Sequence, residues 1–120
     1  MLKATAKAAA EFENIQDIKK SDFELPILGE IIKKLKREII HGRGFVLLRG
    51  LPLEKLSFAD IATMYWGIGT HIGSARSQNT RGHLLGHVID LGSSFENKSE
   101  RGYLTNRHLK YHCDSVDIVG

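Results

Sequence analysis

The sequence predicts an α+β fold in which helices lie against the outside of a β-sheet. Three observations lead to this fold class. An amphipathic pattern runs over residues 28–39, a second helix begins near Ser57, and short apolar runs such as residues 45–48 are typical of strands buried on both faces. With 120 residues and 42% hydrophobic content, the chain is long enough to bury one packed core.

Bulk composition narrows the classes of protein to consider. The net charge is +3, but the basic residues are dispersed, which argues against nucleic-acid binding. No stretch approaches the roughly 18 apolar residues of a membrane span, and the N-terminus has neither a secretory apolar core nor the arginines of a transit peptide. The single cysteine, Cys113, excludes an internal disulfide. We expect a cytoplasmic protein that binds neither nucleic acid nor membrane.

The first predicted helix follows a polar segment. Residues 1–24 are mixed in character, and we expect an extended or partly ordered lead-in to a domain over residues 25–120. From Pro26 onward apolar residues recur at steps of three and four, which predicts a helix that stops at Gly42. Its apolar stripe consists of Leu28, Ile31, Ile32, Leu35 and Ile39.

Basic residues occupy the other side of this predicted helix. They are Lys33, Lys34, Lys36 and Arg37. Two interpretations stay open for them: a face that binds an anion, or a face that is only solvated. We favour the second, because a run of charge on a helix usually serves to keep that face in water.

The second predicted helix begins with a capping box, in which Ser57 is the N-cap and Asp60 lies three residues on. We expect Gly67 and Gly69 to end the helix, and Trp66 to be a core or rim aromatic rather than a ligand-stacking ring. Its predicted core stripe consists of Phe58, Ile61, Ala62 and Tyr65.

The remainder of the chain is predicted to alternate between loops and strands. Residues 70–84 are rich in Gly, Ser, Thr and Asn and indicate a loop, in which His71 would more often lie at the surface than line a pocket. The stretch "LLGHVIDLG" at residues 84–92 resembles a strand. After a polar loop, a last strand is expected at about residues 108–113.

This last strand carries the most informative pair of residues. Side chains two apart in a strand point the same way, so His112 and Asp114 project together and Cys113 faces the opposite side. An imidazole and a carboxylate on one face can hold a divalent metal, and one more histidine would complete the 2-His-1-carboxylate triad of non-haem iron oxygenases. The alternative is a hydrogen-bonded core histidine next to a turn or capping aspartate.

Four stretches have the order along the chain and the residue patterns of one protein family. They are "GFVLLRGLP", "YWGIGTHIG", "QNTRGHLLGHVIDLG" and "RGYLTNRHLKYHCDSVDIVG". From about residue 25 to the end, the sequence resembles the taurine dioxygenase-like (TauD/TfdA) family of Fe(II)- and 2-oxoglutarate-dependent oxygenases. The last stretch is the most specific, and the residues in it that fit the family pattern are Tyr103, Thr105, Asn106, Leu109, His112, Asp114, Asp117 and Ile118.

The resemblance implies a fold and a reaction. The fold would be the N-terminal portion of a double-stranded β-helix, of the jelly-roll or cupin-like kind, with flanking helices and an incomplete barrel. His112 and Asp114 would be two ligands of Fe(II). Oxidative decarboxylation of the co-substrate 2-oxoglutarate to succinate would drive hydroxylation of a small organic substrate. The amide side chains of Gln78, Asn79 and Asn106 are candidates for orienting substrate or co-substrate, or for hydrogen bonds within loops.

The family also carries a second iron histidine and a 2-oxoglutarate-binding arginine far downstream of the first pair. We therefore expect a truncated chain that is inactive alone, and whose open sheet edge allows self-association. His108 cannot replace the second histidine, because four residues along a strand span about 13 Å.

Two other functions remain as alternatives. A non-catalytic remnant of an oxygenase would act as an interaction module that folds and melts without iron. A zinc protein would use His83 and His87, whose spacing suits a metal site on a helix. Gly86 and the β-branched Val88 and Ile89 favour a strand there and argue against that site.

Overall fold

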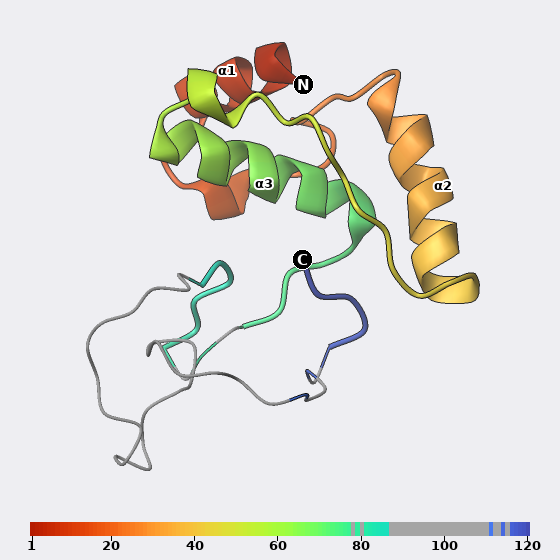
Figure 1. Ribbon diagram of the computed structural model, residues 1–120. Coiled ribbons are helices and arrows are strands. Elements are labelled where there is room, and N and C mark those ends of the chain that lie inside the picture. Colours follow the sequence, from red (N-terminus) through yellow and green to blue (C-terminus); the bar gives the residue numbers. More distant parts are fainter. Residues whose placement is uncertain (78, 80, 87–110, 112–113, 115) are drawn as a thin grey trace. The chain divides into compact units, whose positions relative to one another are not determined.

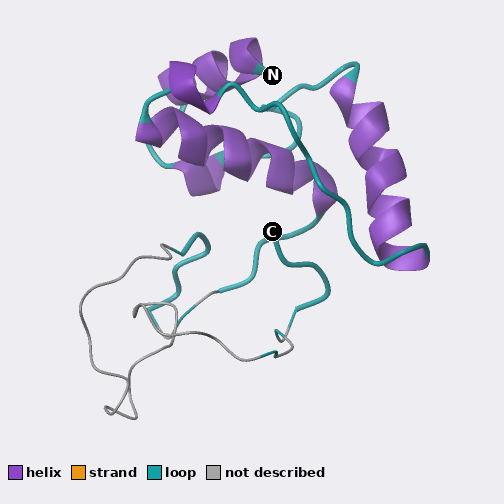
Figure 2. Cartoon of the chain, viewed as in Figure 1, coloured by secondary structure: helices purple, strands orange, loops and turns teal. Residues whose placement is uncertain are grey.

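The computed structural model describes residues 1–77, 79, 81–86, 111, 114 and 116–120. The chain divides into two compact units, residues 1–75 and residues 76–120, and each is considered by itself. The first unit contains all the helices of the described residues, as Figures 1 and 2 show.

Three α-helices form the first unit: α1 at Leu2–Glu11, α2 at Leu28–His41 and α3 at Phe58–Ile72. Two short 3-10 helices, η1 at Ile15–Asp17 and η2 at Leu53–Lys55, lie in the connections. Helices α1 and α2 and the η1 turn all pack on α3, which is therefore the central element of this unit (Figure 1). Among the described residues, no helix is long and apolar enough to cross a lipid bilayer.

The centre of the core is the ring of Phe23, which is 0% exposed. This ring lies against Gly67 of α3, since a Cβ built at Gly67 would come within 2.4 Å of the Phe23 Cγ and Cδ2 atoms. A side chain as small as alanine would collide with it. The buried apolar residues around this contact are Ala8, Ile18, Phe23, Leu25, Ile32, Met64 and Ile68.

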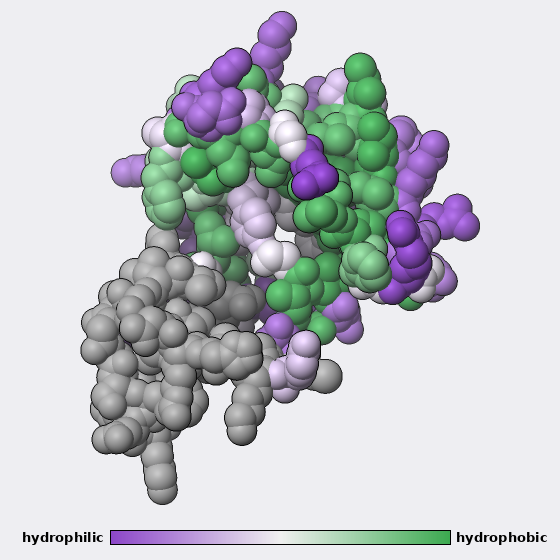
Figure 3. Space-filling view, in the orientation of Figure 1, coloured by the Kyte–Doolittle hydropathy of each residue, from purple (hydrophilic) through white to green (hydrophobic). Residues whose placement is uncertain are grey.

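The predicted fold class is wrong for the part of the chain that the structure describes. No strand or sheet occurs among these residues, and the predicted strand at residues 45–48 is irregular backbone. Phe45 is 67% exposed and Leu47 is 75% exposed, so this run is not a strand buried on both faces. Instead, the Arg43 guanidinium lies 5.7 Å from the centroid of the Phe45 ring. Figure 3 shows apolar side chains gathered at the surface of the molecule.

The structure also corrects the N-terminal segment. Where the sequence indicated an extended or partly ordered lead-in, residues 2–11 form α1 and residues 15–17 form η1. Thr5 and Ala8 of α1 are buried against the core. Small side chains at these positions let α1 approach α3 closely, and this packing gives the segment its helical structure.

Helix α3 differs from its prediction in length and in the face that it buries. Its capping box is confirmed: the Ser57 hydroxyl accepts from the Asp60 N–H at 3.1 Å, and an Asp60 carboxylate oxygen accepts from the Ser57 N–H at 3.3 Å. The helix runs past both glycines to Ile72, because Gly67 serves packing rather than termination. The predicted stripe is also wrong, since Phe58 is 71% and Tyr65 is 47% exposed. The buried residues are Thr63, Met64, Gly67 and Ile68.

The predicted stop of α2 at Gly42 is confirmed. The N–H groups of Gly42 and Gly44 both donate to the Glu38 carbonyl oxygen, at 3.0 and 3.3 Å, and Gly44 adopts a φ of 84° that favours glycine. Arg43 donates from its backbone N and from Nε to the same Glu38 carboxylate oxygen, at 3.2 and 2.8 Å. These bonds hold the pKa of the Glu38 carboxyl below its ordinary value.

Candidate functional site

The predicted iron pair falls at the margin of the described residues. Asp114 is described and exposed, whereas His112 lies outside the described residues, as do Cys113, Gln78 and Asn106. No group of three His, Cys, Asp or Glu side chains that could hold a metal occurs in the described part of the chain. The shared face of His112 and Asp114 therefore stays a prediction.

Asn79 organises a turn in the second unit. Its Oδ1 accepts from the backbone N–H groups of Arg81 and His83 at 3.0 and 3.2 Å, and its carbonyl accepts from the Gly82 N–H at 3.1 Å. The Asn79 Nδ2 amide lies 3.0 Å from the His83 Nδ1 atom. Most of the Asn79 hydrogen-bonding capacity is thus used within its own loop.

That last contact also bears on the zinc alternative. An amide nitrogen can only donate, so His83 Nδ1 accepts a hydrogen bond and is not free to ligate a metal in this arrangement. The His87 side chain lies outside the described residues. The zinc hypothesis consequently has no support from the described geometry of His83.

Two side chains of α3 fix the segment that carries Phe23. Trp66 Nε1 donates to the Ile18 carbonyl oxygen at 3.1 Å, so Trp66 has the rim position expected of it. One turn or so later, His71 Nε2 lies 2.7 Å from the Phe23 carbonyl oxygen. Because Gly67 lies between them and receives the Phe23 ring, this face of α3 binds the segment over residues 18–23 at three points.

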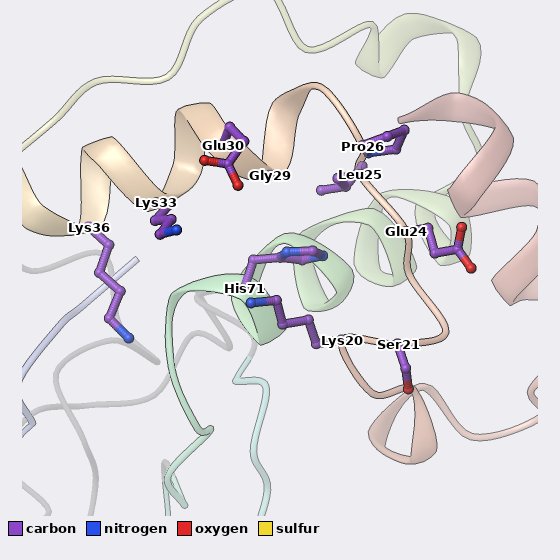
Figure 4. A pocket seen from close by; sticks show the side chains of 10 residues that line it. All are labelled: Lys20, Ser21, Glu24, Leu25, Pro26, Gly29, Glu30, Lys33, Lys36 and His71. Carbon is purple, nitrogen blue, oxygen red and sulfur yellow. The ribbon is translucent and has the colours of Figure 1, made fainter.

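His71 also borders an open cleft of about 780 Å³ within the first unit. Figure 4 shows this cleft between α2, the end of α3 and the loop that precedes α2. The residues that line it include three lysines, two glutamates and one histidine, and the full set is Lys20, Ser21, Glu24, Leu25, Pro26, Gly29, Glu30, Lys33, Lys36 and His71.

The sequence placed His71 in a loop, whereas the structure places it in the last turn of α3. A signal was present: Ile68 and Ile72 continue the apolar spacing of the helix through His71. The two glycines, interpreted as a stop, concealed that signal.

Comparison with known proteins assigns the chain to a class. A family model described as "Taurine catabolism dioxygenase TauD, TfdA family" matches residues 9–118, nearly the whole sequence. The chain belongs to this family, which confirms the resemblance seen in its motifs. The matched range includes both His112 and Asp114.

Two curated relatives show the same relationship. The chain is 29% identical over 120 residues to the FR-33289 synthase of Streptomyces rubellomurinus, covering 99% of this chain and 35% of that protein. It is 32% identical over 104 residues to the taurine hydroxylase-like protein SAT17 of Stachybotrys chartarum, covering 81% of this chain and 27% of that protein. The chain therefore spans about a third of the length of these relatives. No solved structure matches it.

Proposed function

We propose that this chain supplies the N-terminal part of an Fe(II)- and 2-oxoglutarate-dependent dioxygenase that hydroxylates a small organic molecule. The observation that supports this proposal is the match to the family over residues 9–118, which takes in the His-x-Asp pair near the C-terminus. Since the relatives are about three times as long, the proposed activity is that of a longer protein.

The donor set of the proposed site suits iron. An imidazole nitrogen and a carboxylate oxygen are the ligands that non-haem Fe(II) oxygenases use, and His112 and Asp114 offer one of each. When bound, iron together with 2-oxoglutarate would supply the oxidising power for a reaction that consumes dioxygen and yields succinate, carbon dioxide and the hydroxylated product.

The amide residues would have different tasks at this site. Because the Asn79 Oδ1 atom already accepts hydrogen bonds from two backbone N–H groups, we propose that Asn79 stabilises its own loop and does not bind substrate. Gln78 and Asn106 then remain as candidates for hydrogen bonds to substrate or co-substrate. The substrate itself belongs to the class of small organic molecules, and its selection involves residues outside this chain.

The test joins this chain to the part of the FR-33289 synthase that lies beyond the aligned region. We expect the fusion to form succinate from 2-oxoglutarate in an iron-dependent manner. His112→Ala and Asp114→Ala should each lower the rate by a factor of about 100 or more, as loss of a first ligand removes the metal from its working position. Cys113→Ser lies between them, leaves both ligands in place, and is the matched control.

A fusion that folds and forms succinate equally fast with and without His112 would contradict the proposal. The gene itself provides a second measurement that does not depend on folding of the fusion. We expect its reading frame beyond codon 120 to continue into a histidine followed shortly by an arginine. A downstream sequence without this pair would contradict the proposed activity.

A further inference from the structure

The hydrogen bond of His71 determines which ring nitrogen carries a proton. Nε2 lies 2.7 Å from the Phe23 carbonyl oxygen, and a carbonyl oxygen only accepts, so Nε2 must be the donor. A neutral His71 ring therefore presents Nδ1 as a hydrogen-bond acceptor. Among the described residues, no hydrogen bond to this Nδ1 atom is found, which leaves it available to a ligand.

The neighbouring helix leaves room beside this acceptor. A Cβ built at Gly29 of α2 would lie 3.9 Å from His71 Nδ1, so an alanine there would fit and a longer side chain would cover the ring. With glycine at this position, Nδ1 borders the cleft of about 780 Å³ between α2 and α3. That space is far larger than the roughly 30 Å³ occupied by one water molecule.

Three lysines line the same cleft. Lys33 and Lys36 are three residues apart on α2 and so share one face of the helix, and Lys20 comes from the loop before it. Lys36 is half-buried as a residue, which is consistent with its aliphatic stem lying along the protein surface. Figure 4 shows Lys20 beside the His71 ring, whereas Lys33 and Lys36 lie farther from it, along α2.

Two carboxylates oppose this charge in part. In Figure 4 the Glu24 carboxylate points away from His71, whereas Glu30 lies on α2 near Lys33. The lining thus has three lysines against two glutamates, with only Glu30 on the side of the basic residues. This balance indicates moderate affinity for an anion, limited by Glu30.

We propose that the cleft between α2 and α3 binds inorganic phosphate, a small oxyanion that keeps a hydrogen of its own at neutral pH. The lysine ammonium groups would contact its charged oxygens, and the P–OH group would donate to His71 Nδ1. Sulfate has the same shape but no hydrogen at neutral pH, so one of its oxygens would face the Nδ1 lone pair. All residues of this site belong to the first unit.

This geometry predicts a preference between the two anions. In titrations of the 120-residue chain at pH 7.5 and fixed ionic strength, we expect phosphate to bind about tenfold more tightly than sulfate, as expected for one added hydrogen bond and one relieved lone-pair clash. Methyl phosphate, largely without its second proton at this pH, should behave like sulfate, which distinguishes free phosphate from a phosphate ester as the ligand.

Substitutions on α2 test the charged part of the site. Lys33→Ala and Lys36→Ala should each weaken binding of both anions by about fivefold, and Glu30→Gln should strengthen it by about threefold. Lys34→Ala is the matched control, because Lys34 belongs to the same helix and carries the same charge but lies outside the lining of this cleft. It should change the affinity by less than about twofold.

The role of His71 needs a variant that keeps its bond to Phe23, since His71→Ala would also destabilise the fold. Gly29→Leu covers Nδ1 from the other side of the cleft, and we expect it to abolish the preference for phosphate over sulfate. The ¹⁵N resonance of His71 Nδ1 should shift on addition of phosphate and not of sulfate. Equal binding of the two anions, or a Lys34→Ala effect as large as that of Lys33→Ala, would mean an adventitious ion only and would overturn the proposal.

Discussion

Helices α2 and α3 are nearly equal in length but differ in how the molecule surrounds them. Of the 15 residues of α3 four are buried, whereas α2 buries only Ile32 among its 14. Helix α3 has its main helix contacts with α1, η1 and α2, while the main helix contact of α2 is with α3. The stability of the first unit therefore depends mainly on α3, and α2 is free to present polar side chains to a ligand.

The two helices also show that an amphipathic sequence pattern and the extent of burial are different properties. Helix α2 has the clean amphipathic pattern, with apolar and basic residues on opposite sides, yet Ile31 is 47% exposed. Helix α3 is apolar on most of its circumference, and its buried face is chosen by the fit of the Phe23 ring at Gly67. A clear stripe thus indicates a helix, but it does not measure how much of that helix is buried.

The largest expected effect comes from adding a side chain at Gly67 of α3, where the Phe23 ring packs. Gly67→Ala should destabilise the chain by about 3 kcal/mol, because the new Cβ would overlap the fully buried Phe23 ring. Gly69→Ala, in the same helix with nothing within 4 Å of its Cβ, should stabilise by about 0.5–1 kcal/mol through helix propensity. Urea unfolding followed by circular dichroism measures both values.

If Gly67→Ala proved as stabilising as Gly69→Ala, the Phe23 contact would not be the centre of the core. The combination with Phe23→Leu sharpens the test. A smaller, flexible side chain relieves the collision, so the two substitutions together should cost less than the sum of the single costs.

Some of this arrangement was predictable because the signals were local. The capping box of Ser57 and Asp60 and the stop at Gly42 each depend on a few neighbouring residues, and the structure confirms both. The family was likewise predictable, because its motifs are short and ordered along the chain.

Features that depend on distant residues were not predictable in the same way. Nothing near Gly67 in the sequence indicates that a ring from residue 23 fills its place, so the glycine was interpreted as a helix stop. The apolar run at residues 45–48 has the composition of a buried strand, but a strand needs hydrogen-bonding neighbours that the local sequence does not specify. Because Gly67 was interpreted as a helix stop, His71 was placed in a loop and not in the last turn of α3, where it borders the cleft. The predicted positions of His112 and Asp114 stay untested.

A matched pair on α2 tests how firmly that helix is attached. Ile32→Ala should destabilise by about 2 kcal/mol, at the lower end for a buried isoleucine because a helix packed on one side can shift to fill the gap. Ile31→Ala, at the adjacent exposed position, should cost less than about 0.5 kcal/mol. Hydrogen exchange of the α2 amides would show whether the loss is confined to this helix. A cost for Ile31 equal to that for Ile32 would contradict the one-sided packing of α2.

The smallest expected effect concerns the end of α2, where charge rather than burial sets the geometry. Two hydrogen bonds from Arg43 favour the ionised form of Glu38 and lower its pKa below the ordinary 4.5. A carboxyl whose folded pKa is lowered stabilises the fold above its unfolded pKa, and this contribution is lost as the pH falls through the folded value. The last turn of α2 should therefore loosen only below about pH 4.5.

An NMR titration of the Glu38 side chain measures this pKa directly. Arg43→Ala should bring it back toward 4.5, and the amide protons of Gly42 and Gly44 should then exchange faster even at neutral pH. Because both Glu38 and Arg43 are accessible to solvent, raised salt should reduce the pKa difference between the two proteins. An unchanged Glu38 pKa in the Arg43→Ala protein would contradict the role of the Arg43 side chain, and the backbone N–H of residue 43, which the substitution keeps, would then account for the lowered pKa.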